Sequence, residues 1–217
     1  KNFKVVVIDN FSGGHKNNLI HHRKNKNLII KRKDINIIKS SDVLFRNADY
    51  LFHFAGVGDI VPSINMPLNY LNTNILGTVK ILEACKKNKI KKFLYAASSS
   101  CYGITKKNIN ENYPIDTKHP YALSKYLGEQ CVLHWGEIYK IPVNSIRIFN
   151  AYGPRVRTTG AYGAALGVFF KQKLKKKPFT VIGDGKQTRD FVHVKDVANA
   201  FFLAATSKYK NKIFNLG

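Results

Sequence analysis

Short apolar runs, each ended by turn-forming residues, recur along the chain. The first, 4–8 (KVVVI), leads into Asp9 and the turn-rich stretch 10–14 (NFSGG). Runs of β-branched and aromatic residues bounded in this way are typical of buried strands. The same pattern predicts further strands at 50–54, 93–97, 143–149 and 179–182, and a final strand at 214–217.

Segments with helical periodicity lie between these runs. In the clearest of them, 70–87, apolar residues recur at intervals of three and four positions, as on one face of an α-helix. Strands and helices that alternate in this way are typical of βαβ units. We therefore predict an α/β fold, a doubly wound parallel sheet with helices on both faces. The other predicted helices span 121–139, 163–175 and 194–205.

The charge of the chain is strongly basic. Lysine and arginine outnumber aspartate and glutamate by 36 to 13, which gives a formal net charge of +23. Such an excess can mark a nucleic-acid-binding protein. The lysines, however, are scattered among asparagines and isoleucines in stretches such as 21–33, 86–92 and 173–178, which is typical of solvated loops and helix faces. We expect no nucleic-acid partner, although the charge would attract an anionic substrate such as a diphosphate.

The apolar runs and the cysteines restrict the class of protein further. No run approaches the ~20 residues that a membrane span requires, and no signal peptide opens the chain. Cys85, Cys101 and Cys131 are odd in number, far apart and without metal-binding spacing. We expect a cytoplasmic protein with reduced thiols, no metal site and no membrane partner.

Tyr121 and Lys125 are candidate catalytic residues. Four positions apart on the predicted helix, they share one face. A nearby lysine cation lowers the pKa of a phenol, which is about 10 in water, so that the pair can take a proton from a substrate hydroxyl. An exposed helix can carry the same spacing by chance, and the motif alone leaves both interpretations open.

A serine cluster precedes this helix. Ser98, Ser99 and Ser100 follow the strand predicted at 93–97. Ligands bind at the carboxyl ends of the strands in an open parallel sheet. Ser98 could therefore hydrogen-bond the substrate oxygen that Tyr121 deprotonates, and relay its proton.

With these motifs, the sequence resembles the extended short-chain dehydrogenase/reductases, in particular their UDP-sugar 4-epimerase branch. The resemblance covers essentially the whole chain and implies an NAD-binding Rossmann fold. It is carried by stretches in matching order: 7–13 (VIDNFSG), 52–56 (FHFAG), 72–78 (NTNILGT), the serine cluster, 120–125 (PYALSK), 147–155 (RIFNAYGPR), 183–185 (GDG), 189–194 (RDFVHV) and 196–198 (DVA).

The resemblance implies roles for the catalytic and cofactor-binding positions. Tyr121 would be the base, Lys125 its partner, and Ser98 the hydroxyl that bridges to the substrate. Asp9 would accept hydrogen bonds from the adenosine ribose and, by repelling a ribose phosphate, favour NAD over NADP. The cofactor-binding positions implied are Asp9, Asn10, Asp34, Ile35, Phe54, Ala55, Gly56 and Lys125.

The resemblance also implies a substrate-binding set. Arg189 would grip the diphosphate of a UDP-sugar, because a guanidinium donates to phosphate in a bidentate fork. A surface ion pair with Asp190 is the alternative for Arg189. Asn74 would be structural and near the active site. The substrate-binding positions implied are Ser99, Ser100, Tyr121, Asn150 and Arg189.

Ser99 and Ser100 favour epimerisation over the other reactions of the family. In the related 4,6-dehydratases these positions resemble Asp-Glu, and in UDP-glucuronate decarboxylases the second resembles Glu. Elimination needs this further acid and base, which hydroxyls do not readily supply. We predict a UDP-sugar 4-epimerase in which NAD takes the hydride from C4 and returns it to the opposite face. The enzyme alternative is a related dehydratase, decarboxylase or reductase; the non-enzyme alternative is a basic binding module or an inactive remnant.

The resemblance further implies how the chain is organised. We expect residues 1–155 to form the Rossmann domain without its first strand and glycine-rich loop. Residues 156–217 would form a small, incomplete substrate-binding region interleaved with returning Rossmann elements. We expect these 217 residues alone to bind NAD poorly and to be inactive, and the parent enzyme to be a homodimer packed through helices 70–87 and 121–139. Neutral, N-acetylated and uronic acid UDP-sugars all stay open as substrates.

Overall fold

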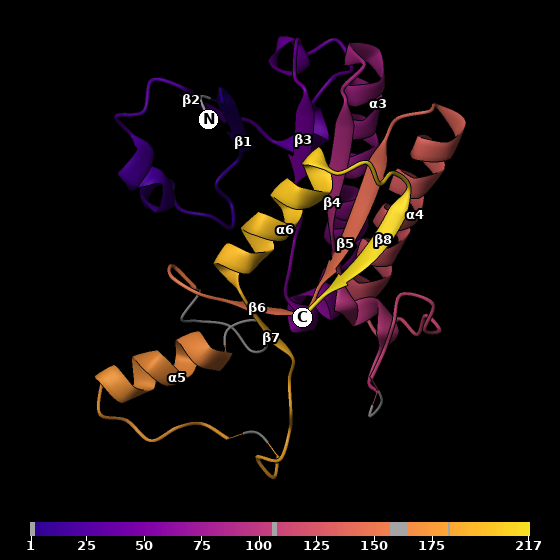
Figure 1. The fold of residues 1–217 in the computed structure, drawn as a ribbon. Helices are drawn as coiled ribbons and strands as arrows, with labels where there is room; N and C mark the ends of the chain where they lie inside the picture. Colours follow the sequence, from indigo (N-terminus) through magenta and orange to yellow (C-terminus); the bar gives the residue numbers. More distant parts are fainter. Residues whose placement is uncertain (1–2, 106–107, 157–164, 182) are drawn as a thin grey trace.

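A parallel four-stranded sheet of order β3-β4-β5-β8 forms the centre of the protein (Figure 1). The computed structural model describes residues 3–105, 108–156, 165–181 and 183–217. The predicted α/β class with a parallel sheet is confirmed. The strands are β3 (Tyr50–His53), β4 (Lys92–Ser98), β5 (Val143–Ile148) and β8 (Lys212–Leu216), the last beginning two residues before the predicted strand.

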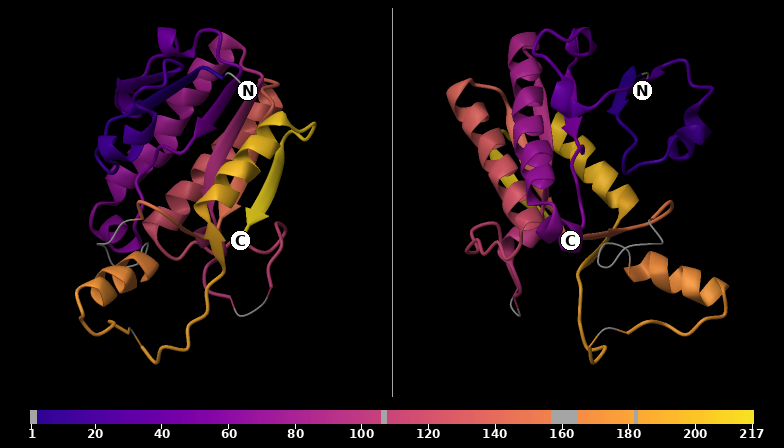
Figure 2. Two further views of the ribbon diagram at one scale, coloured as in Figure 1. Left: turned by 60° about the vertical axis from the view of Figure 1, so that its left-hand side comes forward. Right: turned by 180° about the vertical axis from the view of Figure 1, so that it is seen from behind.

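Helices cover both faces of this sheet, as predicted. α3 (Thr78–Asn88) and α4 (Pro120–Ile138) lie on one face, and α6 (Val194–Thr206) lies on the other (Figure 1, Figure 2). Side chains of β4 alternate between two hydrophobic clusters: Phe93 packs with α3 and α4, whereas Leu94 packs with α6. This burial on both faces explains why the central strand is a continuous apolar run.

A two-stranded parallel sheet, separate from the first, is formed by β1 (Val5–Asp9) and β2 (Leu28–Arg32). The 3-10 segment η1 (Lys16–His22) lies between these strands in the chain. The sequence pattern did not indicate β2, because its three apolar residues sit inside a lysine- and arginine-rich stretch that we assigned to a solvated face.

The predicted helix at 70–87 is confirmed as a longer helical path with a local change of pitch. α1 (Ile60–Asn65) comes first, and α2 (Pro67–Leu71) then continues through the π-helical segment η4 (Asn72–Gly77) into α3. Short π-helical segments are rare and are frequently found at functional sites. Three further 3-10 segments are η2 (Ile35–Ile37), η3 (Val43–Phe45) and η5 (Ser99–Tyr102).

The strand predicted at 179–182 is wrong for the residues described, 179–181. Phe179 and Val181 are exposed and pair with no strand, and the Thr180 amide donates to the Gln172 side chain (3.2 Å). Without a neighbouring strand to accept its hydrogen bonds, an apolar run does not form a β-strand. Ile182 lies outside the described residues.

The predicted helix at 163–175 is confirmed as α5 (Ala165–Leu174), with 163 and 164 outside the described range. A short parallel sheet is formed by β6 (Asn150–Tyr152) and β7 (Phe191–His193).

The described part of the chain contains no disulfide, no membrane-spanning helix and no group of residues arranged to bind a metal ion. Cys85, Cys101 and Cys131 are free thiols, and burial raises the pKa of each. No described helix is long and apolar enough to cross a membrane. No described group of His, Cys, Asp or Glu is arranged to hold a metal ion.

Candidate active site

A cavity of about 300 Å³ lies at the carboxyl ends of β3, β4 and β5. Such a position is expected for the ligand site of an open parallel sheet. The structure brings together here five positions predicted from the sequence: Phe54, Gly56, Ser98, Tyr121 and Lys125. The other described lining residues are Val57, Gly58, Ala96, Ala97, Ile148 and Phe149.

The first turns of α4 present Tyr121 and Lys125 to this cavity. His119 caps the helix, since its Nδ1 accepts a hydrogen bond from the Ala122 amide (3.1 Å), and Pro120 occupies the first turn. Ser98 lines the same cavity as Tyr121, and its hydroxyl acts to lower the pKa of the Tyr121 phenol. The structure thus brings the predicted tyrosine and serine to one place.

The sequence predicts that Lys125 lowers the pKa of the Tyr121 phenol below its usual value, and the structure contradicts this prediction. Burial raises the pKa of the Tyr121 phenol, the Ser98 hydrogen bond opposes this, and the Asp59 carboxylate adds to it. The Lys125 ammonium instead lies 4.5 Å from the centroid of the Tyr95 ring, and burial lowers its pKa to about 8. Because desolvation exceeds any effect of the lysine, the free site holds a protonated phenol.

Asn74, expected near the site, holds the loop that follows β3. Its Oδ1 accepts from the Val57 amide (2.7 Å), and its Nδ2 donates to the Val57 carbonyl (3.0 Å) and to Ser124 Oγ of α4 (2.9 Å). Tyr70 donates a hydrogen bond to the Gly58 carbonyl. Both side chains come from the helical path through η4, so this path fixes the loop against α4.

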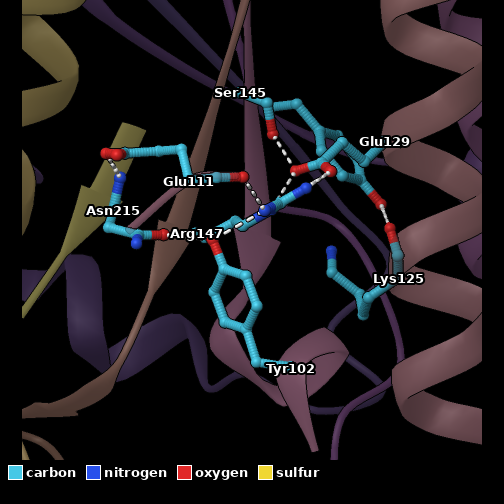
Figure 3. A network of polar contacts seen from close by, with 8 residues as sticks. Tyr102, Glu111, Lys125, Glu129, Ser145, Arg147 and Asn215 are labelled. Atoms are coloured by element: carbon cyan, nitrogen blue, oxygen red, sulfur yellow. Dashed lines mark hydrogen bonds and ion pairs between the residues drawn. The ribbon is translucent and has the colours of Figure 1, made fainter. Parts of the chain in front are cut away.

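A buried ion-pair network, which sequence reasoning missed, joins α4 to the central sheet (Figure 3). Glu129 of α4 accepts from Arg147 of β5 at 2.6 Å and from the Ser145 hydroxyl at 2.7 Å. Arg147 also donates to Tyr102 Oη at 2.6 Å, and Tyr102 donates to Asn215 Oδ1 of β8 at 2.7 Å. The network ties α4, β5, η5 and β8 together. Two features of the sequence could have pointed to this network: Glu129 lies one helical turn after Lys125, and Arg147 opens the matched stretch 147–155.

The predicted cofactor-binding residues of the amino-terminal part gather at the ends of β1 and β2. Asn10 Nδ2 donates to Asp34 Oδ2 (2.9 Å), and Asp9 Oδ1 accepts from the Phe11 amide (2.7 Å). Hydrogen bonds from the Asn36 amide and from Asn10 hold the pKa of Asp34 below its usual value. The Ile35 side chain is buried in the core, and Ala55 packs against the same core.

The predicted substrate-binding residues are divided between two places. Ser100 lies beside the cavity, where its amide and hydroxyl both contact Ser98 Oγ (3.2 and 2.9 Å), and Ser99 begins η5. Asn150 and Arg189 lie at the β6–β7 sheet and are not among the described cavity-lining residues. Asn150 Nδ2 donates to the Asp190 carbonyl (2.9 Å); the exposed Arg189 donates to the Thr188 carbonyl (2.7 Å), and the described residues show no ion pair between it and Asp190.

The geometry agrees with a comparison of the sequence with known families. The family model for the NAD dependent epimerase/dehydratase family matches residues 1–217, the whole chain. The chain belongs to this family. A putative UDP-glucose 4-epimerase of Methanocaldococcus jannaschii is 34% identical over 100% of this chain and 69% of its own length.

Solved structures of the family superpose closely on this fold. The UDP-N-acetylglucosamine 4-epimerase of Methanobrevibacter ruminantium M1, in complex with UDP-N-acetylmuramic acid, has a TM-score of 0.94 at 32% identity, covering 99% of this chain and 68% of that one. The UDP-glucuronic acid 4-epimerase of Bacillus cereus, in complex with UDP-glucuronic acid and NAD, has a TM-score of 0.88 at 31% identity, covering 98% and 69%. The Rossmann-fold prediction and NAD as the cofactor are thereby confirmed.

The comparisons do not distinguish between the reactions that the family catalyses. UDP-glucuronic acid decarboxylases and a dTDP-D-glucose 4,6-dehydratase match at 27% to 31% identity, close to the 28% to 34% of the relatives named as epimerases. The chain spans between 47% and 69% of the length of the curated relatives that it matches.

The residues at the cavity fit an NAD cofactor. Gly56 lets Asn74 pack closely against the loop after β3, since a Cβ would lie 2.9 Å from Asn74 Oδ1 and 3.8 Å from Lys125 Nζ. The buried Lys125 ammonium is a donor that a ribose hydroxyl can use. Phe54, Gly56 and Lys125 would therefore hold the end of the cofactor nearest Tyr121.

Proposed function

We propose that the complete protein, meaning the gene product that contains these 217 residues, is a UDP-hexose 4-epimerase that works through a 4-keto intermediate with tightly bound NAD. The observation that carries the proposal is that Tyr121, Ser98 and Lys125 line one cavity at the carboxyl ends of the strands. Ser99 and Ser100 stand where elimination would require carboxylates.

The residues of the site divide the proton chemistry between them. Ser98 Oγ bridges the sugar 4-hydroxyl and Tyr121, whose phenolate form accepts the proton and whose phenol form later returns it to the 4-keto oxygen. Bound NAD supplies the hydride acceptor and a cationic ring. Because burial keeps the free phenol protonated, the positive charge of bound NAD would be what lowers the pKa of Tyr121 and makes it a base.

The lining of the cavity supports a reaction in which the sugar ring turns over. Val57, Ile148 and Phe149 present apolar surface. Such surface contacts either face of a ring without hydrogen bonds that would hold one orientation.

The residues outside this cavity are assigned on the resemblance alone. Asn150 and Arg189 are assigned to the UDP diphosphate. The residues assigned to the adenosine part of NAD are Asp9, Asn10, Asp34 and Ile35.

A homodimer is the second part of the proposal. The outer surfaces of the helices assigned to the interface are apolar at Leu76, Leu123 and Leu127, which are 55%, 39% and 36% exposed. Leu123 and Leu127, one turn apart on α4, form one stripe. Light scattering on the complete protein should give twice the monomer mass.

The test of the reaction is proton NMR of the complete protein with UDP-glucose or UDP-N-acetylglucosamine. The galacto epimer should appear without added NADH. Release of carbon dioxide, loss of water or stoichiometric consumption of NADH would instead assign the protein to the decarboxylases, dehydratases or reductases.

A further inference from the structure

Lys125 is a buried cation without a carboxylate beside it. It is 7% exposed, and none of the ion pairs among the described residues includes it. Glu129, one turn later on α4, supports the charge, but its carboxylate is already paired with Arg147 at 2.6 Å. Removal of an ammonium from water costs free energy that neighbouring groups must offset. Another partner is therefore needed to hold Lys125 in the site as a cation.

The face of the Tyr95 ring is in the position of that partner. Tyr95 lies on β4 and is fully buried, and the Lys125 ammonium lies 4.5 Å from its ring centroid. The face of an aromatic ring carries the negative part of its quadrupole and attracts a cation within about 6 Å. This attraction is larger where water is excluded, as it is around these two side chains. The ring thus offsets part of the cost of burying the ammonium.

The Tyr95 hydroxyl is turned to the helix backbone. Burial raises the pKa of the phenol, which keeps it neutral, and its Oη donates to the Lys125 backbone carbonyl at 3.3 Å. Gly128 lets α4 approach this ring closely, because a Cβ at that position would clash with Tyr95 Oη. These contacts fix the helix against the ring, while the ammonium meets the ring face rather than a charged oxygen.

The contact with the ring leaves the ammonium beside the loop after β3. A Cβ on Gly56 would lie 3.8 Å from Lys125 Nζ, and both residues line the cavity. Besides Glu129, the titratable groups around the ammonium are Tyr121 on α4 and His53 on β3. Burial raises the pKa of Tyr121 and lowers the pKa of His53 to about 3. Both groups are therefore neutral, and neither carries a charge that would draw the ammonium away from the loop.

We propose that Tyr95 is a positioning residue for NAD: the face of its ring holds the charged Lys125 ammonium beside Gly56, where it can donate to a ribose hydroxyl. Tyr95 is not among the described lining residues and acts through the lysine. Because lysine has a flexible stem and loses its proton readily when buried, the ring both fixes the direction of the side chain and preserves its charge. This role does not depend on which reaction of the family the protein catalyses, since the family as a whole depends on NAD.

The test replaces the Tyr95 ring in graded steps in the complete protein. Tyr95→Phe keeps the ring and removes the hydroxyl, whereas Tyr95→Leu removes the ring face. Phenylalanines with increasing numbers of ring fluorines, incorporated at position 95, draw electron density from the face with little change in shape. The control is Phe93→Leu, which removes another fully buried ring from the same face of β4.

The pKa of Lys125 and the affinity for NAD are measured for each protein. Nuclear magnetic resonance of isotope-labelled lysine gives the pKa of the Lys125 ammonium, whose signal is identified by its absence in Lys125→Met. Calorimetric titration with NAD, after bound nucleotide has been removed, gives the Kd on both sides of that pKa, which is about 8.

Tyr95→Phe should leave both quantities unchanged. Tyr95→Leu should lower the pKa of Lys125 by about 1 and raise the Kd for NAD about tenfold above that pKa, and added fluorines should lower the pKa stepwise. Phe93→Leu should change neither quantity. A constant pKa of Lys125 across the fluorinated series would overturn the inference, as would an equal change in Phe93→Leu. The fluorinated series decides by the same criterion if Tyr95→Leu does not fold.

Discussion

The Glu129 carboxylate lies 2.6 Å from the Arg147 guanidinium, and the two side chains are 1% and 3% exposed. Both Glu129 oxygens accept from Arg147 Nε as well, at 3.1 and 3.2 Å. Glu129 also opposes the burial that lowers the pKa of Lys125 to about 8. One ion pair therefore fastens α4 to β5 and supports the charge of the lysine in the site.

Glu129→Gln should destabilise the protein by about 3–5 kcal/mol, because it leaves the Arg147 charge buried without its partner. It should also lower the pKa of Lys125. As the pH rises, activity that depends on the lysine charge should then be lost at a lower pH in the variant than in the wild type. Urea denaturation and the pH profile of kcat/KM measure the two effects.

Two further variants separate these effects. Glu137→Gln, on the exposed side of the same helix, should change neither quantity. Glu129→Gln combined with Arg147→Met should recover stability but keep the shifted pH profile. An unshifted profile in both Glu129 variants would mean that Glu129 acts on the fold alone.

Tyr121→Phe should reduce turnover by about 10²–10⁴-fold, the usual contribution of a positioned general base. Since Tyr121 lines a cavity and the change removes at most one hydrogen bond, the free energy of unfolding should change by no more than about 1 kcal/mol. Tyr126→Phe on the same helix is the matched control. Full activity of Tyr121→Phe would remove the tyrosine from the mechanism.

The position of the site could be predicted from the sequence because its motifs mark the ends of elements. Ser98 ends β4, and Tyr121 lies in the first turn of α4, so a parallel sheet brings them to the same edge. The pKa values could not be predicted this way. The spacing of Tyr121 and Lys125 indicates a shared helix face but says nothing of burial, and burial decides the pKa of both groups.

Two further features depend on long-range contacts that local patterns do not carry. β2 forms although its apolar residues are few, because β1 supplies a parallel partner for Leu28–Arg32. The apolar residues at 179–181 form no strand, because no partner is present. For the same reason the backbone conformation of Asp59 and its effect on the pKa of Tyr121 could not be predicted, since both depend on the folded chain.

Asn74→Ala should loosen the loop after β3. The change leaves the amide and the carbonyl of Val57 without their partner, at about 1–3 kcal/mol for each buried group. The Val57 amide should then lose its protection from hydrogen exchange, and KM should rise because Gly56 and Gly58 border the cavity. Asn69→Ala, an exposed asparagine of α2, is the control; a protected Val57 amide in the Asn74 variant would contradict this role.

His53 should make the protein less stable in acid. Its ring is buried beside Phe93 and Tyr95, its Nε2 lies 2.9 Å from Thr78 Oγ1, and burial lowers its pKa to about 3, to which the Lys125 charge also contributes. An unfolded histidine has a pKa of about 6.5. As the pH falls from this value toward 3, the unfolded state binds a proton that the folded state does not, and stability falls by up to about 1.4 kcal/mol per pH unit.

The measurement is the free energy of unfolding between pH 7 and pH 4 for the wild type, His53→Gln and the exposed control His134→Gln. The glutamine amide can still donate to Thr78 but does not titrate. His53→Gln should therefore flatten the slope by about one proton relative to the wild type, whereas His134→Gln should leave it unchanged. Carboxylates titrate equally in all three proteins, so equal slopes would mean that His53 is protonated inside the fold.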